Sequence, residues 1–211
     1  MTLLRSRPGL SLVELLLFVA LLAVVGSAVI ALLWSTIDSQ LRQQAITDIE
    51  QNGVQILQGL AYHVRHAERV LDPPLGESGA VLALQTGTPD MNPTIVGIQS
   101  GSLLMIEKYN EFGLSDALVR VSNFRVFNTS ASADMPSVYV RFTLTRDIPL
   151  PQIHSYSRAF EGAFSLFPDD EASGDACGCA APVCAGSGSL YLWETCEGEA
   201  CEALSSHLSC D

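Results

Sequence analysis

A run of twenty uncharged residues, Leu15–Trp34, constrains this chain more than any other feature. About 20 apolar residues span the hydrocarbon core of a bilayer as an α-helix. Glu14 directly precedes the run, and an acidic side chain in a membrane-length segment is costly and usually functional. Arg5 and Arg7 lie before the run, and no basic residue follows it until Arg42. This asymmetry predicts a single-pass protein whose carboxyl terminus lies outside the cytoplasm.

The amino-terminal segment could be processed in more than one way. A secretory signal would be cut after small residues, and Val25-Gly26-Ser27-Ala28 offers them inside the apolar run. No polar boundary follows that site, because apolar character continues to Trp34. An anchor that is never cut is the second interpretation. The third is a cut in the basic leader, ahead of Glu14.

A short motif favours the third interpretation. The sequence Arg5-Ser6-Arg7-Pro8-Gly9, followed by Leu10-Ser11-Leu12-Val13-Glu14, resembles the amino-terminal motif of type IV prepilins and type II secretion pseudopilins. The resemblance implies that a membrane-embedded prepilin peptidase cuts between Gly9 and Leu10 and methylates the new terminus at Leu10. Many family members have Phe where this chain has Leu10, and both residues are apolar.

The same resemblance implies a role for Glu14 in filament assembly, through pairing with the amino terminus of a neighbouring subunit. The physical reason is the cost of a lone carboxylate in lipid, several kcal/mol unless it is paired or neutralised. The α-amino group of Leu10 could also compensate it within one chain, four residues away on a helix. The simpler alternative is that Glu14 lies at the level of the lipid headgroups.

Function and partners follow from the resemblance as expectations. They describe a structural subunit, not an enzyme, assembled into a type IV pilus or a type II secretion pseudopilus near its tip. The diffuse order of later segments is similar to J-type minor pseudopilins and minor pilins. The implied partners are the prepilin peptidase and methyltransferase, other pilin subunits, an inner-membrane assembly platform and, before assembly, lipid. The rival function is a membrane-anchored extracytoplasmic binding module or adhesin with a disulfide-rich tail.

The predicted fold class is α+β: a long amino-terminal helix, its first half transmembrane, packed on an antiparallel β-sheet, with a Cys-rich carboxyl-terminal extension. An apolar stripe in steps of three and four residues from Ile37 to Leu71 extends the helix, and Asp72-Pro73-Pro74 is predicted to end it. Gly53 and Gly59 in this stretch indicate a bend or a close packing contact. The predicted parts are the leader 1–9, the membrane half of the helix 10–34, its amphipathic half 35–71, a β-rich domain 72–167 and an acidic extension 168–211.

Six segments have the composition and turn boundaries of strands. Ser100-Gly101 predicts a tight hairpin, and a break in alternation at Ser122-Asn123 predicts a bulge. The predicted strands are Val81–Gln85, Thr94–Gln99, Ser102–Tyr109, Ala117–Phe127, Ser137–Thr145 and Ser157–Phe167.

All cysteines lie in the last part of the chain, which also holds nine acidic residues and no Lys or Arg after Phe167. An even number of clustered cysteines beyond a membrane segment favours disulfides, although zinc and free thiols remain alternatives and the connectivity is open. The acidic residues are expected to form a solvated surface. The candidate disulfide residues are Cys177, Cys179, Cys184, Cys196, Cys201 and Cys210.

No residues suggest catalysis, a cofactor or a metal site strongly enough to be predicted. Asp169-Asp170-Glu171 is only a weak calcium candidate beside a flexible acidic linker. His63 and His66, with Glu68 nearby, are better explained as helix surface than as metal ligands. The net charge of −12 argues against direct binding of nucleic acid.

Overall fold

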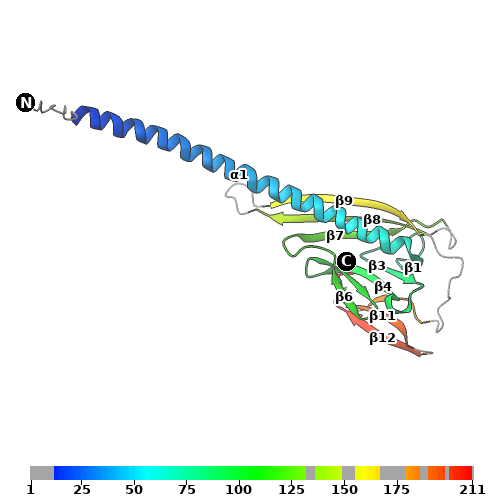
Figure 1. The fold of residues 1–211 in the computed structure, drawn as a ribbon. Helices are drawn as coiled ribbons and strands as arrows, with labels where there is room; N and C mark the ends of the chain where they lie inside the picture. The colour runs from blue at the N-terminus through cyan, green and yellow to red at the C-terminus, as the bar shows by residue number, and fades with distance from the viewer. Residues whose placement is uncertain are drawn as a thin grey trace, which may run out of the picture. The chain divides into compact units, whose positions relative to one another are not determined.

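A computed structural model describes residues 12–131, 136–148, 155–166, 179–185, 190–197 and 200–210. Within them the fold is α+β, as predicted: one long α-helix, α1 (Leu12–Arg65), and antiparallel β-sheets (Figure 1). The chain divides into two compact units, residues 1–44 and 45–211, and α1 contributes to both.

Two antiparallel sheets build most of the second unit, in the strand orders β1-β3-β4-β5-β6 and β2-β7-β8-β9. A short 3-10 turn, η1 (Pro89–Met91), precedes β4. The strands of the first sheet are β1 (Ala67–Asp72), β3 (Val81–Thr86), β4 (Thr94–Gln99), β5 (Ser102–Glu107) and β6 (Asn110–Gly113). Those of the second are β2 (Ser78–Gly79), β7 (Arg120–Asn128), β8 (Ser137–Asp147) and β9 (Ser155–Ser165).

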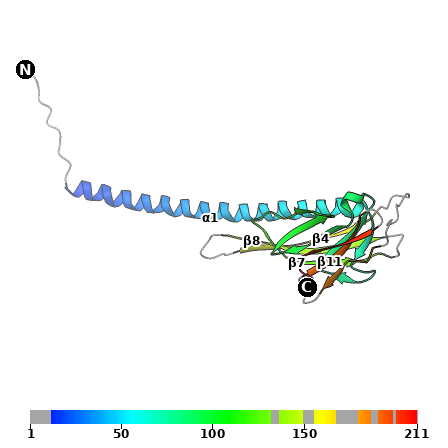
Figure 2. The ribbon, with the colours of Figure 1, turned by 90° about the horizontal axis from the view of Figure 1, so that it is seen from below.

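The second half of α1 packs against these sheets, and β8 and β9 lie alongside it in both views (Figures 1 and 2). Its buried residues recur every three or four positions, the period of one helix face. They join inward-facing residues of both sheets, such as Leu82, Val140 and Phe142, in one core. The buried positions of α1 are Ala45, Ile49, Gly53, Ile56, Leu60 and Val64.

Two ion pairs also connect α1 to the four-stranded sheet. Asp48 pairs with Arg146 of β8, and Glu50 pairs with Arg158 of β9. All four side chains are partly exposed, and exposed ion pairs contribute at most about 1 kcal/mol each. The apolar core therefore holds the helix on the sheet.

The acidic tail forms a third sheet and a second core. Strands β10 (Val183–Ala185), β11 (Leu190–Glu197) and β12 (Ala200–Ser206) pair in that order. Tyr191 and Trp193 of β11 pack against Val81 and Ala83 of β3, whose neighbours Leu82 and Leu84 face the first core. Every residue of β3 is consequently buried. The described acidic side chains stay outside this core: Glu202 is exposed and Glu194 is half-buried.

The helix ends earlier than the stripe predicted. It stops at Arg65, and Ala67–Asp72 form β1 instead of a last helical turn. Ala67 is buried, as the helical period required, but in a strand that pairs with β3. The physical reason is long-range: the β1–β3 ladder satisfies the backbone of these residues, and no local signal marks the change before Pro73.

The six predicted strands are all present, with ends shifted by a few residues. The Ser100-Gly101 hairpin is confirmed, because both residues adopt positive φ, 51° and 84°, as a tight turn between antiparallel strands requires. The bulge is confirmed by a break in the β7–β8 register between Ser122 and Arg125 and by a φ of 53° at Asn123.

Candidate functional site

The first candidate site is the apolar part of α1 in unit 1. It is long and apolar enough to cross a membrane, and none of its apolar window is buried within the protein. Side chains such as Leu12 and Leu32 are 74% and 69% exposed. Contiguous apolar surface of this extent needs lipid or another protein to cover it.

Two hydroxyl groups in and just after this apolar segment are satisfied locally. The hydroxyl of Ser27 donates to the Val24 carbonyl oxygen at 2.8 Å, and that of Thr36 donates to the Leu32 carbonyl oxygen at 2.9 Å. Such bonds remove the need for water, which the hydrocarbon region lacks. They leave the carboxylate of Glu14 as the one strongly polar group between Leu12 and Ile37.

Glu14 lies in the first turn of α1 and is exposed. The positive end of the helix dipole favours a negative side chain there by about 0.3–1 kcal/mol. That gain is smaller than the several kcal/mol that a carboxylate loses in lipid, so a further cation is needed. Among the described residues, no ion pair involves Glu14. The predicted cleavage residues Gly9 and Leu10 lie outside the described residues.

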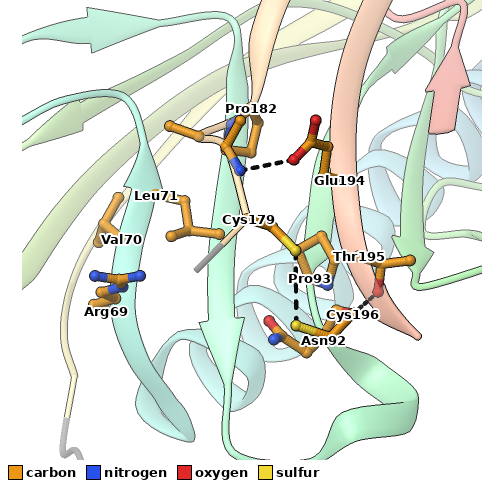
Figure 3. Close-up of a pocket in the computed structure, with 12 residues that line it drawn as sticks. Arg69, Val70, Leu71, Asn92, Pro93, Cys179, Pro182, Glu194, Thr195 and Cys196 are labelled. Carbon is orange, nitrogen blue, oxygen red and sulfur yellow. Dashed lines mark hydrogen bonds between the residues drawn. The ribbon is translucent and has the colours of Figure 1, made fainter. Parts of the chain in front are cut away.

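The second candidate site is the disulfide-bonded tail. Disulfides join Cys179 to Cys201 and Cys184 to Cys210, with sequence separations of 22 and 26 residues. Cys196 is disulfide-bonded as well, and its Sγ lies 3.7 Å from that of Cys179 (Figure 3). Cys177 lies outside the described residues. The prediction of disulfides is confirmed, and no described cysteine is free.

The described cysteines are disulfide-bonded and so offer no thiolate to zinc. In the described part of the chain, one group has metal-ligand spacing: Cys179, Glu194 and Cys201, with ligand atoms within 4.8 Å of one another. Two of these three residues share a disulfide, so they offer no thiolate. The calcium candidate Asp169-Asp170-Glu171 lies outside the described residues.

A cavity of about 230 Å³ lies where the tail meets β1 and the start of β4. The Ala180 N–H donates to Glu194 Oε2 at 2.8 Å on one side, and the Thr195 hydroxyl donates to the Asn92 carbonyl oxygen at 2.8 Å on the other (Figure 3). Ligand pockets are typically about 300–1,000 Å³. This cavity is smaller, and the polar groups just named in its wall already hydrogen-bond to one another.

His63 contacts a carboxylate, and the described residues place no group of potential metal ligands around it. Its Nδ1 lies 3.5 Å from Glu107 Oε1 on β5. Burial lowers the pKa of His63, and the negative charge of Glu107 opposes that shift. His66 donates from Nδ1 to the Tyr62 carbonyl oxygen at 2.7 Å, and Glu68 accepts from Gln85 at 3.1 Å. Among the described residues, His63, His66 and Glu68 therefore each contact a different partner and do not converge on one point.

Two aromatic residues that the sequence reasoning missed join the tail to the main domain. Tyr191 is fully buried, and its hydroxyl donates to Asp72 Oδ2 at 2.7 Å. Burial raises the pKa of Tyr191, and the charge of Asp72 adds to that shift. The sequence offered only a weak signal: residues 190–195 are rich in the aromatic and apolar residues of strands, but Leu190 and Leu192 are apolar too, so no alternation marks the buried face.

The Tyr191–Asp72 contact makes stability depend on pH. Burial raises the pKa of Asp72 above its usual 3.8, although the hydrogen bond from Tyr191 opposes the shift. As the pH rises through that usual value, the unfolded chain loses this proton while the folded protein retains it, so the folded state loses relative stability.

Asp72→Asn stays neutral and can still accept the hydrogen bond. We expect the free energy of unfolding of the variant, minus that of the wild type, to increase between about pH 4 and pH 7. Denaturant titrations of both proteins test this, and a difference that does not change with pH would contradict it.

Comparison of the chain with protein-family models, with curated proteins and with solved structures found no match.

Proposed function

We propose that this protein is a structural subunit of a filament of the type IV pilus or type II secretion pseudopilus class. One observation carries the proposal. Glu14 stands in the first turn of a 54-residue helix whose first part is apolar and unburied and whose second part holds a folded domain. A simple anchor needs neither an acid at that position nor a helix longer than the bilayer.

The exposed apolar surface suits two environments in succession. Before assembly, lipid covers the side chains of residues 15–34. In a filament, the same side chains pack against helices of neighbouring subunits, so the transfer exposes no apolar surface to water. Glu14 fits this scheme because the amino terminus of a neighbouring helix supplies a positive charge at the same depth. Pairing therefore sets the axial register between two subunits.

The proposal includes a cellular route. The precursor enters the cytoplasmic membrane once, with residues 35–211 outside the cytoplasm. The prepilin peptidase cuts after Gly9 and methylates Leu10, and the assembly platform then moves the subunit into a periplasmic or surface filament. Disulfides in the tail suit an oxidising compartment outside the cytoplasm. The resemblance to J-type subunits supports a place near the filament tip.

A second candidate function is a tethered binding module. The disulfide-bonded tail favours it, because its strand β12 is largely exposed and carries acidic Glu202, which accepts a hydrogen bond from Tyr109 at 2.7 Å. In this case α1 only anchors the protein. The two candidates differ in what Glu14 does.

Mass analysis of the mature amino terminus tests the proposed function. We expect the protein from its native host to begin at Leu10 and to carry one added methyl group. Gly9→Val is the control, because a bulky residue before the cleaved bond blocks processing and should leave the whole leader in place. An intact Met1 in the wild-type protein, or a start beyond residue 25, would reject the proposal.

A further inference from the structure

The outer face of the four-stranded sheet carries a small cluster of basic and aromatic residues, here called the basic face. It consists of Arg125 and Phe127 on β7 and Tyr139 and Arg141 on β8. Arg125 and Arg141 are exposed, and Phe127 is 39% exposed. The alternate residues of both strands, such as Val126 and Val140, point into the core. The basic face is therefore the side of the sheet that the core does not use.

The pairing of the strands brings like charges together. Arg125 lies directly opposite Arg141, and Phe127 lies directly opposite Tyr139. The two rings are in contact, with centroids 5.8 Å apart. Opposed like charges on neighbouring strands destabilise a sheet by up to about 1 kcal/mol. A neutral residue in place of Arg125 would relieve this repulsion, so folding does not account for the charge of Arg125.

One described acid lies on the same face, and it forms no ion pair with either arginine. Glu161 on β9 is the partner of Arg141 in the β8–β9 ladder, but its carboxylate accepts a hydrogen bond from the Tyr139 hydroxyl at 2.5 Å. This bond raises the pKa of Tyr139. Within the described ranges, neither Arg125 nor Arg141 forms an ion pair. This face thus carries two guanidinium groups without an ion pair and one carboxylate that Tyr139 engages, on a protein whose net charge is −12.

We propose that the basic face binds a carboxylate-rich polypeptide segment of a partner protein. Arginine is the side chain best suited to carboxylates, because its planar group donates two parallel hydrogen bonds. Phe127 and Tyr139 provide an apolar contact beside the charges, which suits side chains between the acids. A segment with a few carboxylates places its charge within reach of the two arginines, and beyond about 8 Å salt screens its repulsion from the rest of the protein.

Single-stranded nucleic acid is the competing ligand, because aromatic and basic residues on a sheet can also stack bases. One feature disfavours it. A polynucleotide carries its charge along its whole length, so it would extend over the acidic remainder of the protein.

The test uses the full-length protein in detergent micelles and a fluorescent peptide of alternating glutamate and serine. Binding is measured by fluorescence anisotropy at low and moderate salt. We expect Arg125→Gln/Arg141→Gln to weaken binding about tenfold, and added salt to weaken binding to the wild type. The matched control is Arg42→Gln/Arg65→Gln, which removes the same charge from exposed positions on α1 and should bind as the wild type does.

Three results would overturn the proposal: no binding of the peptide to the wild type, equal loss in the control variant, or tighter binding of an oligothymidylate of equal charge. A peptide with glutamine in place of glutamate separates charge from apolar contact and should not bind. The melting temperature of the Arg125→Gln/Arg141→Gln variant should not fall, because the substitution relieves like-charge repulsion. A variant that melts well below the wild type is replaced by Arg125→Gln alone, which should still weaken binding.

Discussion

Replacing Glu14 with alanine is expected to stop entry into filaments while leaving membrane insertion and processing intact. Alanine suits both a helix and lipid, and the residues around the predicted cut are unchanged. The variant loses the carboxylate that we propose pairs with a neighbouring amino terminus. A buried pair of this kind is worth about 3 kcal/mol in lipid, which corresponds to about a hundredfold loss of incorporation.

The experiment compares sheared filaments with membranes for the wild type, Glu14→Ala and Glu14→Asp. Glu14→Asp keeps the charge on a shorter side chain and should retain part of the assembly. Mass analysis of the membrane fraction shows whether the alanine variant is still processed. Normal incorporation of a processed alanine variant would reject the assembly role of Glu14 and favour the tethered binding module.

Replacing Gly53 with alanine is expected to destabilise the domain, although alanine is the better helix former. A Cβ at Gly53 would lie 2.2 Å from Cε1 of Phe160, far inside contact distance. Phe160 is buried and stacked on Phe142, with centroids 5.6 Å apart, so its ring has little room to move. The overpacking costs about 1–3 kcal/mol, and the gain in helix propensity returns at most about 1 kcal/mol.

Gly59 supplies the control for this prediction. A Cβ there would meet Leu114 Cδ2 at 3.7 Å, an ordinary contact, so Gly59→Ala should stabilise the protein by up to about 1 kcal/mol. Denaturant unfolding gives both values, and Gly53→Ala combined with Phe160→Val should recover part of the loss. If Gly53→Ala is as stabilising as Gly59→Ala, α1 does not approach β9 closely enough at this position to exclude a methyl group.

Gly53 shows what the sequence could predict about the packing of α1 and what it could not. The apolar stripe placed Gly53 on the buried face of the helix, and the choice between a bend and a close contact was open. The structure decides for the contact, because β9 brings Phe160 onto that position. Phe160 is 107 positions further along the chain, and periodicity within a helix carries no information about it.

The tail shows the same limit for the candidate sites. Its acids and cysteines were evident, and disulfides followed from their number and from the membrane segment. The sequence did not predict that Cys179 pairs with Cys201 and Cys184 with Cys210, because each bond depends on how β10, β11 and β12 align. The burial of Tyr191 against Asp72 depends on a contact across 119 positions.

The sequence by itself determined the membrane-length helix, the position of Glu14, the hairpin at Ser100-Gly101 and the oxidised state expected of the cysteines. Each of these depends on composition or on backbone preferences over a few residues. Only the tertiary structure decided that α1 ends at Arg65, that the tail covers β3 and that Arg125 faces Arg141. These features depend on strand pairing, in which the partner of a residue lies far away in the chain and is selected by the packing of the whole domain.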